Sequence, residues 1–210
     1  MKIQLALDRL SIQEAIAIGE EVREYVDWVE VGTSLIKEYG MDSVRALRNA
    51  FPEKTIIADM KTIDNSRYEF ELCYRAGADV ATVMGVSPVV TIANCLEVAL
   101  SYNKEVMIDL LQVSDLHFKE ISTFDKAIFC QHLSKDLQED ASNTLLDKPI
   151  FKNEKLNYAV AGGISRTSFP EIMNMNPKIV IIGSAITQSD NPKQAAKFFY
   201  ELTREKGNCT

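Results

Sequence analysis

The chain has 210 residues, a length that fits one domain built around a single large core. Hydrophobic residues make up 46% of the chain and charged residues 25%, a composition typical of globular proteins, which excludes a largely disordered chain. The formal net charge is -7 and acidic and basic residues are interspersed without a basic patch, so we expect no nucleic-acid partner.

Membrane and disulfide signals are also weak. The first apolar run is too short for a signal peptide, and no later run approaches the length of a membrane span. We therefore expect no membrane partner and a location in the cytoplasm. Cys73, Cys95 and Cys130 lie in apolar segments without the spacing of a zinc site, which predicts buried core thiols.

Short apolar segments rich in Val, Ile and Ala recur along the whole chain, which is typical of strands that are buried on both faces. There are eight such segments, at residues 3–7, 26–31, 55–59, 79–84, 105–110, 126–131, 157–161 and 178–183. Longer amphipathic segments separate them, so each predicted strand is followed by a predicted helix.

Several of these helices have clear start signals. Residues 11–14 and 66–69 both read S-x-x-E, the spacing of a capping box. Asn191 followed by Pro192 is typical of an N-cap with proline at the first helical position. The connection between residues 110 and 126 is short, so we expect a truncated helix there.

Eight strand–helix units predict a parallel sheet with right-handed crossovers. At this length the economical closure is a single α/β domain, a (β/α)8 barrel over residues 1–210. An open doubly wound sheet is the alternative, but the G-x-G-x-x-G fingerprint expected after its first strand is absent.

Charged residues gather where the predicted strands end, which in a barrel is where active sites form. These residues are Asp8, Glu30, Asp59, Lys61, Asp64 and Asp109. Two unit charges at about 4 Å interact by ~4 kcal/mol at an effective dielectric constant of 20, so a carboxylate cluster needs positive charge. Lys61 could supply it, and so could a divalent cation such as Mg²⁺ shared by Glu30 and Asp59. Helix capping or salt bridges would explain the same two acidic residues equally well.

Two glycine loops and one histidine complete the set of candidates. Gly162-Gly163 and Gly183-Ser184 each follow a strand, and the corresponding loops of such barrels often bind phosphate, although the glycines could also serve only to make tight turns. His132 stands at the end of the sixth strand, where an imidazole could shuttle a proton or could be merely structural.

Six motifs in this order resemble the orotidine-monophosphate decarboxylase superfamily of ribulose-phosphate-binding barrels: LALD, VEVGT, ADMKTID, ATVMGV, AVAGGIS and IIGSAIT. Within it, the chain is most similar to the branch that holds 3-hexulose-6-phosphate synthases and 3-keto-L-gulonate-6-phosphate decarboxylases. The resemblance implies a homodimer with its active sites at the interface and a phosphorylated ketose as substrate.

The resemblance also implies roles for individual residues. Glu30 and Asp59 would hold Mg²⁺, while Asp59 and Lys61 would contact substrate oxygens. Asp64 would reach into the partner's site. His132 matches a histidine that is characteristic of the family. Asp8 and Asp109 match positions near substrate or metal-bound water. The matches in the phosphate loops are Gly162, Gly163, Gly183 and Ser184.

The implied reaction is a carbon–carbon lyase reaction: Mg²⁺-dependent addition of formaldehyde to ribulose 5-phosphate, or its reversal, through a cis-enediolate. Decarboxylation of 3-keto-L-gulonate 6-phosphate shares this intermediate and is the alternative. Ser184 favours the synthase, because the decarboxylases usually carry arginine there. The segment QHLSKD, residues 131–136, matches neither pattern, and its Lys135 stands where the decarboxylases carry arginine. A catalytically silent sugar-phosphate-binding barrel is the alternative from another class.

Overall fold

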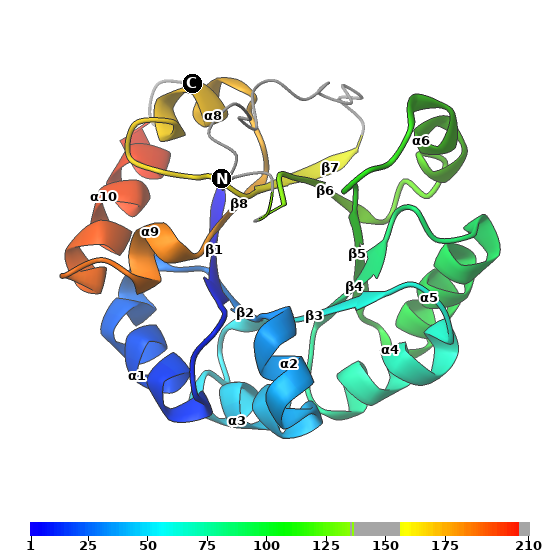
Figure 1. The fold of residues 1–210 in the computed structure, drawn as a ribbon, viewed down its shortest axis with the longest axis horizontal. Helices are drawn as coiled ribbons and strands as arrows, with labels where there is room; N and C mark the ends of the chain where they lie inside the picture. The colour runs from blue at the N-terminus through cyan, green and yellow to red at the C-terminus, as the bar shows by residue number, and fades with distance from the viewer. Residues whose placement is uncertain (135, 137–155, 206–210) are drawn as a thin grey trace.

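A computed structural model describes residues 1–134, 136 and 156–205, and within these residues the strands close into one parallel barrel. β1 pairs with β8 as well as with β2, which closes the ring seen in Figure 1. The prediction of a (β/α)8 barrel is confirmed, and the open sheet is excluded. The strands are β1 (Lys2–Leu7), β2 (Trp28–Val31), β3 (Thr55–Thr62), β4 (Val80–Met84), β5 (Glu105–Asp109), β6 (Ile128–His132), β7 (Asn157–Ala161) and β8 (Ile179–Ile182).

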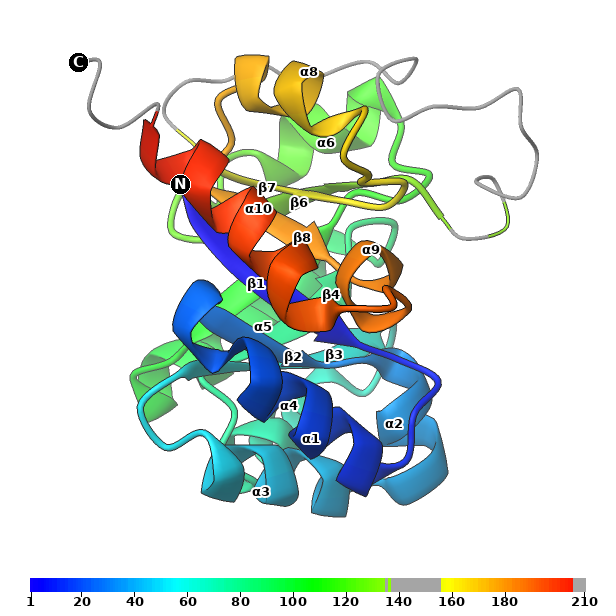
Figure 2. The same cartoon turned by 90° about the vertical axis from the view of Figure 1, so that its left-hand side faces the viewer.

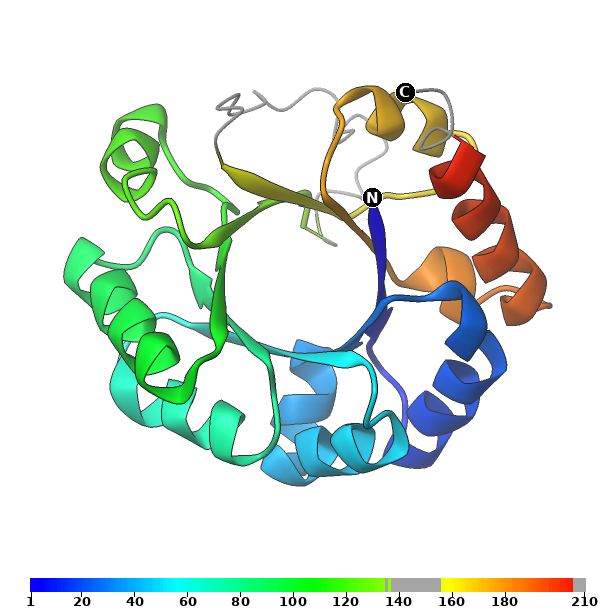
Figure 3. The same cartoon turned by 180° about the vertical axis from the view of Figure 1, so that it is seen from behind.

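Helices surround this barrel on the outside, as the view from behind in Figure 3 also shows. In side view, α2 and α9 lie at the carboxyl end of the strands (Figure 2). The short α6 matches the truncated helix predicted for this crossover. The described helices are α1 (Ile12–Val22), the 3-10 helix η1 (Arg23–Tyr25), α2 (Thr33–Tyr39), α3 (Met41–Ala50), α4 (Ser66–Arg75), α5 (Val89–Tyr102), α6 (Asp115–Ile121), α8 (Phe169–Asn174), α9 (Ser184–Thr187) and α10 (Pro192–Glu205).

Two of the predicted helix starts are confirmed. The Ser11 hydroxyl accepts the backbone N–H of Glu14 at 3.2 Å, and the Glu14 carboxylate accepts the backbone N–H of Ser11 at 2.8 Å, which completes the capping box. At α10, the Asn191 side chain accepts the backbone N–H of Gln194 at 2.9 Å, and Pro192 is the first helical residue.

The capping box predicted at residues 66–69 is wrong. Ser66 is already helical, and the cap position is taken by Asn65, whose φ of 54° is left-handed. The Glu69 carboxylate instead accepts the hydroxyl of Thr62 at 2.5 Å. Glu69 therefore ties the start of α4 back to the end of β3.

Alternating strand residues build two separate cores. Residues that point outward pack against the helices, whereas residues that point inward form a smaller cluster within the barrel, including Trp28, Ile57, Val80, Met107, Ile128 and Ile179. The first residue of several strands belongs to this inner cluster, so the amino end of the barrel is apolar and the carboxyl end is left to polar groups. Cys73, Cys95 and Cys130 are buried, as predicted.

Among the described residues, no helix combines the length and the apolar character needed to cross a membrane.

An ion-pair cluster lies before β4, around Asp79. Its carboxylate accepts the guanidinium of Arg48, the ammonium of Lys104 at 2.7 Å and the backbone N–H of Ile56 at 2.9 Å. Burial opposes ionisation of this carboxyl, but these donors outweigh it and lower the pKa of Asp79. Asp79 thus fastens α3 and the start of β5 to the amino end of the barrel.

We expect Asp79→Asn to lower the free energy of unfolding at pH 7 by about 2 kcal/mol, since hydrogen bonds to a charged group are lost. Because folding depresses this pKa, the carboxylate stabilises the fold above its unfolded pKa of about 4, and that contribution is lost as the pH falls through the folded value. Chemical denaturation at pH 7 and pH 3 should therefore show a gap between wild type and variant that shrinks in acid.

Asp42→Asn is the matched control, because the Asp42–Arg45 pair is strongly exposed and should contribute less than about 1 kcal/mol. A stability gap for Asp79→Asn that stays constant between the two pH values would contradict this role.

Candidate active site

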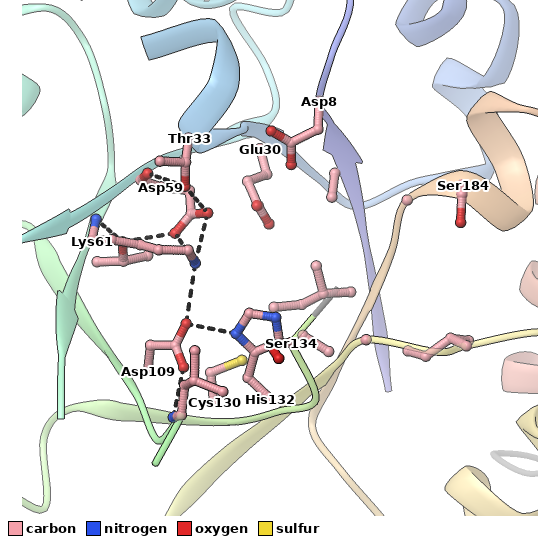
Figure 4. Close-up of a pocket in the computed structure, with 18 of the residues that line it drawn as sticks. Asp8, Glu30, Thr33, Asp59, Lys61, Asp109, Cys130, His132, Ser134 and Ser184 are labelled. Carbon is pink, nitrogen blue, oxygen red and sulfur yellow. Dashed lines mark hydrogen bonds and ion pairs between the residues drawn. The ribbon is translucent and has the colours of Figure 1, made fainter. Parts of the chain in front are cut away.

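A pocket of about 370 Å³ opens at the carboxyl end of the barrel, and every strand contributes to its wall or to the loop just beyond. The predicted residues Asp8, Glu30, Asp59, Lys61, Asp109, His132, Gly162, Gly163, Gly183 and Ser184 all line it. Figure 4 shows that the charged side chains gather on one side and Ser184 lies across from them. The prediction that these residues lie together at the carboxyl end of the strands is therefore confirmed.

Asp59 is the most firmly held of the acidic residues. One carboxylate oxygen, Oδ2, accepts the Thr33 hydroxyl at 2.7 Å, and the other, Oδ1, accepts the Thr82 hydroxyl at 2.9 Å. The ammonium of Lys61 lies 3.0 Å from Oδ1 and 2.9 Å from Oδ2. Asp59 is therefore a buried carboxylate with a fixed orientation and a cation in contact.

Lys61 extends from Asp59 to Asp109, whose Oδ2 lies 3.1 Å from Nζ (Figure 4). Burial disfavours the ammonium charge, but the two carboxylates outweigh it and raise the pKa of Lys61, so the side chain stays protonated. The backbone of Lys61 has a φ of 51°, and the β3–β4 register shifts between Ala58 and Thr62. This irregularity places a left-handed, non-glycine residue in the centre of the site.

Asp109 also orients His132. Its Oδ2 lies 2.8 Å from His132 Nδ1, and its Oδ1 accepts the backbone N–H of Leu111 at 2.9 Å. Burial acts to raise the pKa of Asp109, but His132 and Lys61 lower it to about 2, so the carboxylate is ionised. An ionised Asp109 requires the proton on Nδ1, which leaves Nε2 of His132 as the ring nitrogen that can exchange a proton with a ligand.

Glu30 is buried on β2 beside Asp59, and its Oε2 accepts the Gln4 amide at 2.5 Å. Burial raises the pKa of Glu30 well above its usual range, and the Asp59 and Asp8 carboxylates raise it further. Asp8 is more exposed and accepts the backbone N–H and hydroxyl of Ser34 at 3.1 and 2.7 Å. Three carboxylates thus share this side of the mouth.

The donor set of Glu30 and Asp59 fits Mg²⁺. The described residues contain no group of three or more His, Cys, Asp or Glu side chains arranged around a common metal position. Mg²⁺, however, is commonly held by one or two carboxylates, with water and substrate oxygens completing its shell. Burial raises the pKa of Glu30, and the neighbouring Asp59 and Asp8 carboxylates raise it further, so these groups would attract a cation placed between them.

The glycine loops form the opposite wall. Gly162 and Gly163 have φ values of 91° and 66°, so both positions need glycine for the tight turn after β7. Gly183 and Ser184 connect β8 to α9. The turn-forming interpretation is thus confirmed for the first loop, while phosphate binding by either loop stays a prediction.

Asp64 alone among the predicted residues does not line the pocket. It follows β3 and is exposed. The predicted role in a partner's site is untested by a single chain. Within QHLSKD, His132 and Ser134 line the pocket, and Lys135 lies outside the described residues.

Sequence reasoning missed several residues of this site, namely Gln4, Arg9, Thr33, Thr82 and Ser134. Gln4 and Thr82 did carry a signal, since each is a polar residue inside a predicted apolar run. Thr33 lies in the VEVGT motif, directly after the glycine. Ser134 lies in the divergent QHLSKD segment, and no comparable pattern marked Arg9.

The model for the Orotidine 5'-phosphate decarboxylase / HUMPS family matches residues 1–199. The chain belongs to this family. A 3-hexulose-6-phosphate synthase of Bacillus subtilis (strain 168) is 34% identical over 206 residues, which is 96% of this chain and 98% of that protein.

Solved structures give the same result. The crystal structure of 3-hexulose-6-phosphate synthase from Salmonella typhimurium has a TM-score of 0.90 at 32% identity, covering 98% of this chain and 99% of that one. That of 3-keto-L-gulonate-6-phosphate decarboxylase from Vibrio cholerae O1 biovar El Tor has a TM-score of 0.82 at 26% identity, covering 97% of both chains. The resemblance seen in the motifs is confirmed, and with it the expectation of a carbon–carbon lyase.

The left-handed backbone of Lys61 predicts an unusual order of stability. Lys61→Gly and Lys61→Ala both remove the ammonium, but alanine keeps a Cβ that is disfavoured at this φ. We expect the glycine variant to be more stable by about 0.5–1 kcal/mol in chemical denaturation. At Met60, whose φ is not positive, the same pair should show the opposite order. Equal stabilities at position 61 would argue against the strained backbone.

Proposed function

We propose that this chain is an Mg²⁺-dependent 3-hexulose-6-phosphate synthase, which adds formaldehyde to ribulose 5-phosphate or reverses that addition. The observation that carries the proposal is the Asp59–Lys61–Asp109–His132 chain of contacts in the pocket. It puts a protonated ammonium next to a histidine oriented for proton transfer. The similarity to synthases over nearly the whole chain supports the same reaction.

In this proposal the substrate spans the pocket. Its phosphate lies at the Gly162-Gly163 and Gly183-Ser184 loops, where backbone N–H groups can approach closely. Its carbonyl end would then face the side of the pocket where Lys61 and the other charged side chains lie (Figure 4). Glu30 and Asp59 would hold Mg²⁺, which when bound would supply positive charge to the oxygens of an enediolate.

The residues of the chain would carry the proton transfer. His132 Nε2 removes a proton from the hydroxymethyl carbon next to the ketone, and Lys61 stabilises the negative charge that develops on the enediolate oxygens. The enediolate carbon then forms a bond to the formaldehyde carbon, and the ketone is restored. The alkoxide from formaldehyde takes a proton from His132, which returns the site to its starting state.

The charges of the described site favour an uncharged one-carbon partner. Lys61 is already paired with the buried carboxylates of Asp59 and Asp109. The carboxylate of a sugar acid placed beside Lys61 would therefore be repelled by these two groups. The structural similarity to a 3-keto-L-gulonate-6-phosphate decarboxylase keeps CO₂ release as the second candidate. Measuring formaldehyde release from hex-3-ulose 6-phosphate and CO₂ release from the keto acid separates the two.

A silent sugar-phosphate-binding barrel is the candidate from a different class. It requires that wild type bind ribulose 5-phosphate without turnover of either substrate. Turnover that disappears in Lys61→Ala excludes it. A location in the cytoplasm stays a prediction.

We expect His132→Asn to lower kcat by about 10²–10⁴-fold, because the proton-transfer group is lost while the phosphate contacts remain. KM for ribulose 5-phosphate should change little. Steady-state assay of hexulose phosphate formation measures both constants. His117→Asn serves as the control, since His117 lies on α6 and contacts Glu120 and the Ser87 carbonyl, outside the pocket. Equal kcat values for His132→Asn and wild type would remove His132 from the mechanism.

The homodimer is part of the same proposal. The segments that follow β3 and β4 carry several large apolar side chains that are exposed in the single chain, namely Ile63, Tyr68, Val86, Val89 and Val90. Asp64 follows Ile63 directly in the chain and is also exposed. Burying such a group of large apolar side chains between two chains would bring Asp64 to the partner.

Mixing two inactive variants tests this arrangement. If Asp64 serves the partner's site, a heterodimer of Lys61→Ala and Asp64→Ala has one site with both defects and one intact site. Random exchange of subunits should then restore about a quarter of the wild-type activity. No recovery, with heterodimers demonstrated by native mass spectrometry, would show that Asp64 acts within its own chain.

A further inference from the structure

Thr82 is a buried hydroxyl on β4 that points into the pocket. Its strand, Val80–Met84, is otherwise apolar. A threonine that served only to fill space at this position could be valine, which has nearly the same shape. The reason for a hydroxyl must therefore be in its contacts.

Those contacts join the two central residues of the charged side. The Thr82 oxygen accepts the backbone N–H of Lys61 at 2.8 Å and donates to Oδ1 of Asp59 at 2.9 Å. The hydroxyl donates its proton to the Asp59 carboxylate, and its oxygen accepts the amide hydrogen of Lys61. The hydroxyl therefore acts as donor and acceptor at the same time. Hydrogen bonds linked in this way polarise and strengthen one another.

The first of these bonds falls at the irregular part of β3. Where the β3–β4 register shifts, Thr82 provides an acceptor from a side chain for the Lys61 amide. Thr82 thus provides a hydrogen-bond acceptor for the backbone N–H of Lys61, the residue with the left-handed φ. The side chain of the same residue extends to Asp109.

We propose that Thr82 is a positioning residue, whose hydroxyl fixes both the left-handed backbone of Lys61 and the orientation of the Asp59 carboxylate. Thr33 also donates to Asp59, at the other oxygen, but it makes no hydrogen bond to Lys61. Thr82 therefore sets the position of ammonium and carboxylate relative to each other. For its effect on turnover and metal binding, the inference rests on the proposed function.

The test compares Thr82→Val, which keeps the shape and removes the hydroxyl, with Thr82→Ser, which keeps the hydroxyl. We expect kcat/KM to fall about 10–100-fold in the valine variant, because small displacements of a reacting group have large effects. The loss should be mainly in kcat, and Thr82→Ser should remain within about threefold of wild type. If the valine variant does not fold, Thr82→Ala takes its place with the same expected loss.

A second readout does not depend on turnover. Mn²⁺ binding to the substrate-free protein, followed by the loss of the free-ion EPR signal, should weaken about 10-fold in Thr82→Val and recover in Thr82→Ser. Thr203→Val is the control for removing a buried hydroxyl elsewhere, since the Thr203 hydroxyl on α10 donates to the Tyr200 carbonyl, far from the residues that line the pocket. It should leave both readouts unchanged.

Two results would overturn the inference: a folded Thr82→Val with wild-type kcat/KM and Mn²⁺ affinity, or a Thr82→Ser as impaired as the valine variant. Failure of the proposed function looks different, since wild type would then neither turn over the substrates nor bind Mn²⁺. In that case a crystal structure of Thr82→Val tests the positioning role directly. Unchanged positions of Lys61 and Asp59 would refute the positioning role, and displaced ones would support it.

Discussion

The contact of one ammonium with two buried carboxylates is the constraint on which the site depends. Asp59 and Asp109 are almost fully buried, and charges removed from water are costly unless opposite charge lies within contact. Lys61 satisfies both at once, at distances of 2.9–3.1 Å. Lys61 lies on β3 and Asp109 on β5, so this contact forms only when the two strands lie on either side of β4. The parallel strand order therefore assembles this part of the site.

The amino end of the barrel stabilises the fold, and the carboxyl end carries the candidate site. The inner apolar cluster fills the amino end, and the Asp79 ion pairs fasten helices and strands there, away from the pocket. The carboxyl end carries the groups that oppose folding, namely several close carboxylates and a left-handed lysine. Strain at the mouth is thus offset by regular packing at the base, an arrangement expected of functional sites.

Much of this could be predicted from the sequence, because eight apolar runs fix the strands and a parallel barrel brings their ends together. The sequence could not show which polar residues inside strands matter, since Thr82 and Gln4 acquire their roles only through contacts across strands. The capping box at Ser66 failed because Asn65 adopts a left-handed backbone that no local pattern signalled. The role predicted for Asp64 lies in a partner's site, so a single chain does not test it.

Asp109 joins two chemical roles in a single carboxylate. One oxygen, Oδ2, contacts both the ammonium of Lys61 and the imidazole of His132. A change at either partner alters the electrostatic environment of the other, so substitutions at the three positions are not independent. Acid–base and charge-stabilising groups would be gained or lost together in such a site. Because Lys61 and His132 share this oxygen, a substitution at Asp109 would disturb both contacts at once.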